Sequence, residues 1–177
     1  MYQAIIEKYY PEDGALRRLL LSHSRQVADL CLDVCRRHPE LDIDQVFIEE
    51  AAMLHDIGIR WCHAPGIYCT GDEPYLRHGI IGGRVLRDEG LPRHARVCER
   101  HSGAGITRRQ IEERQLPLPL ADWLPETLDE QLVCYTDKFF SKSHPERVLT
   151  VEQAAHSLEP FGNDGVERFL HWHELFK

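Results

Sequence analysis

Ligand-type side chains on apolar helix faces are the feature that most constrains how this chain folds. His55 lies four residues after Ala51 and seven after Ile48, so the helical repeat places it on a face that should be buried. Asp56 follows it directly. Burying an imidazole beside a carboxylate costs several kcal/mol unless both groups find partners. We therefore expect a shared partner inside a helical bundle.

Two further helices repeat this pattern. His23 has Leu20 three residues before it and Val27 four residues after it, and Asp137 has Val133 four residues before it. Each residue taken alone would more often be a hydrogen-bonded core residue than a ligand. Three separate helices that direct such side chains inward predict one common site.

The apolar pattern is helical throughout. No stretch alternates apolar and polar residues long enough to indicate a strand, and no segment repeats at a fixed period. We predict an all-α fold, with residues 1–177 forming a single domain, a helical bundle of about eight or nine helices. Its metal-binding core would cover about 20–145, and C-terminal helices would cover about 150–176.

Several helix boundaries have recognisable signals. Helices are expected over 12–21 and 22–37, with Ser22 as the N-cap of the second, and over 44–57, with Gly58 closing it. Later helices begin with the capping-box spacing, and these pairs are Thr107 with Gln110, Thr127 with Glu130 and Thr150 with Gln153.

Two segments lack helical periodicity. Residues 59–74 are rich in Gly, Pro, Cys and aromatic side chains and predict a lid or binding loop, while 115–125 contain three prolines. Trp61 in the first segment either stacks on a nucleobase or covers the helical core.

Composition limits the partners. The sequence has 21 Lys and Arg against 29 Asp and Glu, a formal charge of −8, which argues against diffuse binding to nucleic acid or an anionic membrane. No apolar run is long enough for a membrane span, so we expect a cytoplasmic protein. The 6 cysteines are scattered and predict reduced thiols. The 11 histidines are a surplus, and histidine is the commonest metal ligand.

The order of the inward residues resembles a known pattern. His23, then His55-Asp56, then Asp137 is similar to the H…HD…D pattern of the HD superfamily of metal-dependent phosphohydrolases, and residues 55–58 resemble its best-known sequence block. The resemblance covers about residues 20–145. It implies an all-helical core in which His23, His55, Asp56 and Asp137 hold a metal.

Two more histidines extend the resemblance. His78 and His101 lie between the His-Asp pair and Asp137, which gives the order H…HD…H…H…D. This order is similar to that of the binuclear HD proteins, including the symmetrical diadenosine tetraphosphate hydrolases. The resemblance implies a second metal held by His78 and His101 and bridged by Asp56. The alternative is a solvent-facing His78 and a His101 that a helix dipole favours.

The resemblance also implies a chemistry and a set of substrate contacts. Imidazole and carboxylate ligands suit Fe, Mn, Co, Ni or Zn, and the family favours iron. Asp56 and Lys138 are the predicted catalytic residues. The resemblance favours Lys138 and Arg60 as phosphate-binding residues, and Arg77 and Arg100 are predicted to join them because they directly adjoin His78 and His101 in the sequence.

The expected function is a metal-dependent phosphohydrolase that cleaves a nucleotide or dinucleoside polyphosphate with a metal-bound hydroxide. Two alternatives stay open: a di-iron oxygenase on the same scaffold, and a non-catalytic, nucleotide-binding regulatory module. The expected partner is a small phosphorylated substrate, with a homodimer possible and no nucleic acid or membrane.

Overall fold

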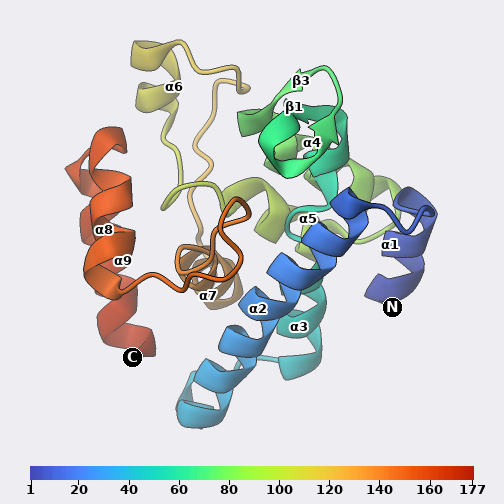
Figure 1. The fold of residues 1–177 in the computed structure, drawn as a ribbon. Helices are drawn as coiled ribbons and strands as arrows, with labels where there is room; N and C mark the ends of the chain where they lie inside the picture. The colour runs from blue at the N-terminus through green and yellow to red at the C-terminus, as the bar shows by residue number, and fades with distance from the viewer.

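The structure is a computed structural model that describes residues 1–177, and it consists of nine α-helices and one small sheet (Figure 1). The first five helices are α1 Tyr2–Tyr9, α2 Ala15–Arg37, α3 Gln45–Leu54, α4 His78–Asp88 and α5 Pro92–Arg100. The last four are α6 Arg108–Arg114, α7 Leu128–Asp137, α8 Val151–Leu158 and α9 Asn163–Phe176.

The long helix α2 replaces two predicted helices. It runs from Ala15 to Arg37 without interruption, so Ser22 lies inside it and is not an N-cap. No Gly or Pro occurs in this stretch to stop the helix, and its buried residues follow one face from Leu20 to Cys35. The prediction of a break at residue 22 was wrong.

A three-stranded sheet corrects the strictly all-α prediction. Strand β1 (Cys62–Ala64) pairs antiparallel with β2 (Cys69–Thr70) and parallel with β3 (Glu73–Pro74). The register places His63 opposite Thr70 on one side and opposite Pro74 on the other. Strands of two or three residues are too short to give an alternating pattern, so the sequence showed only a loop here.

The helix boundary next to His55 and Asp56 also differs from expectation. Helix α3 ends at Leu54, and a 3-10 helix (Ile57–Trp61) follows it, so Gly58 lies inside a turn instead of closing a long helix. Helix α4 begins at His78, after a second 3-10 turn over Tyr75–Arg77. The capping boxes at the start of α6, α7 and α8 are confirmed.

One hydrophobic core of 34 buried residues connects the helices, with contributions from Ile5 in α1 to Phe176 in α9. Helix α2 packs on α3, α4 packs on α5, and α7 contacts α2, α3 and α5. Helices α8 and α9 pack against each other on the side of α7 away from α1 (Figure 1). All six cysteines are free and buried. None of the helices is both long and apolar enough to cross a membrane.

Candidate metal centre

Six buried ligand-type side chains converge from five helices. His23 lies in α2, His55 and Asp56 follow α3, His78 begins α4, His101 follows α5 and Asp137 ends α7. Each is at most 6 % exposed. The helix ends therefore deliver these side chains to one point, and they form two groups around Asp56.

The first group, called the carboxylate-rich group below, consists of His23, His55 and Asp137 with Oδ2 of Asp56. Asp137 Oδ1 lies 2.9 Å from His23 Nε2 and 3.5 Å from His55 Nε2. Asp56 Oδ2 lies 3.2 Å from His55 Nε2 and 3.4 Å from His23 Nε2. The ligand atoms of His23, His55 and Asp137 are all within 4.8 Å of one another, so they could hold a metal ion.

The second group, called the histidine pair below, consists of His78 and His101 with Oδ1 of Asp56. Each Nε2 atom lies 3.4 Å from that oxygen, and the two Nε2 atoms are 2.9 Å apart. The two carboxylate oxygens of Asp56 therefore face different histidines. This arrangement fits a carboxylate that bridges two cations.

The ring nitrogens that face away from Asp56 fix the tautomers of three histidines. Nδ1 of His55 donates to the carbonyl oxygen of Ala52 at 2.6 Å, and Nδ1 of His78 and His101 donates to backbone carbonyls at 2.6 and 2.7 Å. A carbonyl oxygen can only accept, so in the neutral rings each Nε2 carries a lone pair. Lone pairs and carboxylate oxygens that face one another need a cation between them, and such backbone contacts are typical of metal-bound histidine.

Burial and neighbouring charges give the histidines of the two groups different pKa values. Burial, followed by the neighbouring His101, lowers the pKa of His78 to about 3, so this ring is neutral. Although burial works against it, the carboxylates of Asp56 and Asp137 raise the pKa of His55 to about 9. Oδ1 of Asp56 is buried without a hydrogen-bond partner. The site thus combines negative charge with an unsatisfied acceptor, and a divalent cation, which would take the place of the proton on His55, fits it.

Close backbone contacts bring these elements together. A Cβ atom on Gly79 would lie 2.6 Å from the carbonyl oxygen of Cys98, and one on Gly82 would lie 2.5 Å from its Sγ. A Cβ atom on Gly58 would collide with the carbonyl oxygen of His78. Because these three glycines have no side chains, α4 approaches both α5 and the turn after α3, and the histidine pair reaches Asp56.

The comparison with known families agrees with this geometry. The model of the HD domain family matches residues 20–141, which contain all six ligand-type residues. The chain belongs to the HD domain family. The HD superfamily consists of metal-dependent phosphohydrolases, and its members bind divalent metals. The predicted membership of this superfamily is therefore confirmed, while the finer resemblance to the symmetrical diadenosine tetraphosphate hydrolases stays a prediction.

The curated relatives of this HD protein are not named as hydrolases. An uncharacterized protein of Methanocaldococcus jannaschii is 34% identical over 118 residues, covering 66% of this chain and 61% of its own. Two proteins named tRNA (cytidine(56)-2'-O)-methyltransferase, from Picrophilus torridus and Thermoplasma volcanium, are each 28% identical, over 82% and 88% of this chain. The chain spans only 40% and 41% of their lengths. No solved structure matches it.

Two lysines at the end of α7 and in the segment after it neutralise the buried carboxylates. Lys142 Nζ lies 2.6 Å from Asp56 Oδ2, and Lys138 Nζ lies 2.8 Å from Asp137 Oδ2. The sequence indicated Lys138 but not Lys142, which lies five residues beyond the end of α7, where helical spacing no longer predicts direction. A turn in which Phe140 N donates to Asp137 O at 3.2 Å returns the chain to the site. The only available signal was a second lysine soon after Asp137-Lys138.

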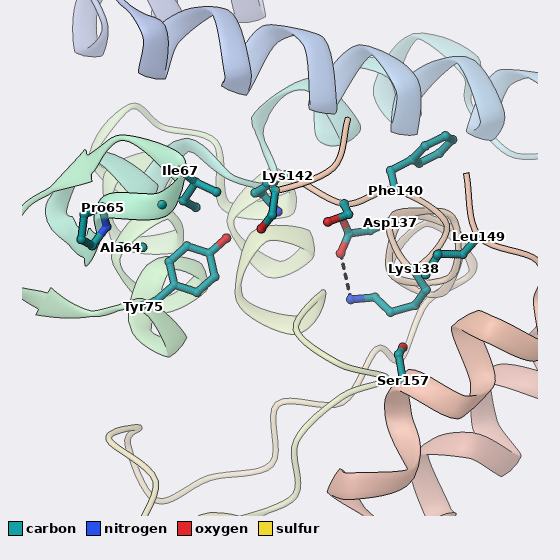
Figure 2. Close-up of a pocket in the computed structure, with 13 residues that line it drawn as sticks. Ala64, Pro65, Ile67, Tyr75, Asp137, Lys138, Phe140, Lys142, Leu149 and Ser157 are labelled. Atoms are coloured by element: carbon teal, nitrogen blue, oxygen red, sulfur yellow. Dashed lines mark ion pairs between the residues drawn. The ribbon is translucent and has the colours of Figure 1, made fainter. Parts of the chain in front are cut away.

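A cavity of about 520 Å³ lies beside the carboxylate-rich group and is called the site cavity below. Asp137, Lys138 and Lys142 line it, with Tyr75 and Ser157. Figure 2 shows Lys138 between Asp137 and Ser157, and Lys142 and Tyr75 facing the same space. Two ammonium groups in one cavity suit an anionic ligand.

The predicted phosphate-binding arginines lie away from the site cavity. Arg77 pairs with Glu73 at 2.8 Å, and the guanidinium of Arg100 lies 3.5 Å from Glu99. Neither lines the site cavity. Adjacent helical positions diverge by about 100°, so a residue beside an inward ligand turns away from it. Their roles in substrate binding stay predictions, and Lys138 is the predicted contact that the structure places at the cavity.

Arg60 and Trp61 lie in a neighbouring part of the surface. Arg60 lines a separate hollow of about 380 Å³, with its guanidinium 5.5 Å from the ring centre of Tyr10. The ring of Trp61 meets that of Tyr9 edge-on at 5.9 Å. These contacts favour the alternative in which Trp61 covers the helical core.

Proposed function

We propose that this chain is a metal-dependent phosphohydrolase that acts on a nucleotide or a dinucleoside polyphosphate. One observation carries the proposal: the two oxygens of Asp56 face the carboxylate-rich group and the histidine pair, each at distances of 3.2 to 3.4 Å. A bridging carboxylate between two sets of ligands is the arrangement that a binuclear centre needs.

Two divalent ions held here would polarise a phosphoryl oxygen and supply a water that ionises near neutral pH. The protein residues supply the rest. Asp56 fixes the two ligand groups relative to each other, and the backbone carbonyls that accept from Nδ1 hold the rings of His55, His78 and His101 in place. Lys138 and Lys142 offset the negative charge of a phosphate in the site cavity.

We infer a centre of two ions with iron as the first choice. The donor set contains imidazole and carboxylate groups and no thiolate, and the thiol of Cys98 donates to the carbonyl oxygen of His55 instead. Fe, Mn, Co, Ni and Zn all accept such ligands. Elemental analysis of the purified protein measures both the identity and the number of ions.

The names of the methyltransferase relatives bear on the substrate and not on the reaction. The chain spans about two fifths of those proteins, and a His and Asp donor set indicates metal chemistry. These names nevertheless make tRNA a necessary member of any substrate panel, alongside small nucleotides, although the charge of −8 argues against diffuse binding to nucleic acid.

The experiment is an incubation of the protein, loaded in turn with Fe, Mn and Co, with nucleoside monophosphates, diadenosine tetraphosphate and tRNA. We expect metal-dependent release of phosphate or nucleotide from at least one small nucleotide, and loss of release on chelation. The Asp56→Asn variant provides the matched control for contaminating phosphatase. Equal release by this variant and the wild type, or no release from any member, would contradict the proposal.

A further inference from the structure

A second cavity adjoins the site cavity and is called the apolar chamber below. It has a volume of about 240 Å³ and lies between the 103–106 loop, α6 and the end of α8. Its walls are mainly hydrocarbon, and the apolar residues that line it are Leu76, Ala104, Ile106, Leu116, Leu158 and Phe161. None of these residues belongs to the metal centre, and the proposed reaction does not use them.

The chamber shares a wall with the site cavity. Lys138 and Ser157 line both spaces. The ammonium group of Lys138 is held by Asp137 at 2.8 Å (Figure 2), so its hydrocarbon stem is the part of the side chain left to face the apolar space. A phosphate beside Lys138 would therefore direct its organic substituent toward the chamber.

The polar side chains of the chamber are already engaged. Gln110 Nε2 donates to the carbonyl oxygen of Phe161 at 2.8 Å, and its Oε1 accepts from Thr107 N at 2.8 Å. Arg114 donates to the carbonyl oxygen of Pro160 at 2.9 Å. These bonds hold the walls together and leave a surface suited to an apolar group. The chamber is smaller than the roughly 300–1,000 Å³ of a complete ligand pocket, so it fits one part of a ligand.

We propose that the apolar chamber binds the aromatic ring of a phosphorylated substrate, such as a nucleobase, while Lys138 and Lys142 contact the phosphate. The proposal rests on the proposed function, whose site it extends. It also gives the two lysines distinct surroundings, because Lys142 lines the site cavity and not the chamber.

Phosphonates test the chamber without any turnover, because a phosphohydrolase does not cleave their C–P bond. The full-length, manganese-loaded protein is titrated calorimetrically with phenylphosphonate and with methylphosphonate, which carry the same charged group. We expect phenylphosphonate to bind at least about tenfold more tightly, since burial of a ring removes apolar surface from water.

Two variants locate the ring. Leu116→Trp fills the chamber and should bring the two affinities within about twofold, with methylphosphonate binding unchanged. Leu120→Trp is the matched control, because Leu120 lies in the same segment, is 48 % exposed and is outside the chamber. Phe161→Ala removes a wall residue that is 53 % exposed, so it tests the chamber even if Leu116→Trp does not fold.

The outcomes are distinct. Loss of the phenyl preference in Leu116→Trp or Phe161→Ala, and its retention in Leu120→Trp, would support the proposal. Equal affinities in the wild type, or a preference that both chamber variants keep, would overturn it. A dimer by light scattering that Phe161→Ala dissociates would instead assign the chamber to a second copy of the chain. Absence of hydrolysis with an intact phenyl preference would contradict the proposed function alone.

Discussion

The carboxylate-rich group and the histidine pair share Asp56 but are built differently. The first places two carboxylates with two imidazoles and joins residues that are 114 positions apart, His23 and Asp137. The second places two imidazoles against a single carboxylate oxygen and joins His78 and His101, which are 23 positions apart. The carboxylate-rich group therefore provides more negative charge and connects more distant parts of the chain.

This difference predicts unequal roles for two ions. An ion in the carboxylate-rich group would bind more tightly and would link α2 to α7, so its binding would contribute to the stability of the fold. An ion held by the histidine pair would bind less tightly and would be lost first.

The largest effect is expected from Asp56→Asn, because Asp56 belongs to both groups. An amide supplies one acceptor oxygen and no charge, so we expect fewer than one ion per chain and a loss of at least about a thousandfold in kcat/KM. Asp88→Asn, at an exposed acid in α4, is the control and should retain full loading. Elemental analysis and steady-state kinetics measure the two effects, and normal loading of Asp56→Asn would remove the bridging assignment.

The second-largest effect is expected from two variants that each disturb only one of the two groups. His78→Ala should lower the metal content from two ions to one and change the melting temperature little. His23→Ala should lower both the metal content and the melting temperature, because it removes a ligand from the group that joins α2 to α7. Elemental analysis and thermal melts before and after dialysis test this contrast. One ion in both the wild type and His78→Ala would demote the histidine pair to a structural role.

Lys142→Met should have a smaller effect, and this effect is expected on substrate binding. The variant keeps the volume of the side chain and removes the ammonium group 2.6 Å from Asp56, so we expect KM for a nucleotide to rise about tenfold while the metal content is retained. Arg147→Met, at an exposed cation of the same loop, is the matched control. Identical KM values in the two variants would show that Lys142 does not contact substrate.

The smallest effect is expected from Trp61→Ala. Its ring packs against Tyr9 outside the site cavity, so the melting temperature should fall by a few degrees and KM should change less than about twofold. A large rise in KM without a change in melting temperature would restore the stacking role that the sequence left open.

The six converging ligand-type residues could be found from the sequence because their information is local and periodic. His23, His55 and Asp137 each lie at helical spacing from apolar residues, and the order of all six matches a family pattern. Lys142 could not be found, since a non-helical turn after α7 sets its direction. The sheet in 59–74 was missed because strands of two or three residues contain at most one full alternation.

The direction in which a helical side chain points also explains why the predicted phosphate contacts of the arginines gained no support. Arg77 and Arg100 were chosen because they adjoin His78 and His101 in the sequence. In the folded chain they extend toward Glu73 and Glu99 instead. Sequence adjacency to a ligand is therefore weaker evidence for a substrate contact than a shared cavity is.

The glycine contacts between α4 and its neighbours have a consequence for mutational tolerance. Gly58, Gly79 and Gly82 meet a backbone carbonyl or a buried sulfur where a Cβ atom would stand, so even alanine requires a backbone shift. In a library of all single substitutions, these three positions should reject every side chain, although none of them is a ligand. The spacing of the metal centre would then depend on residues that carry no chemistry of their own.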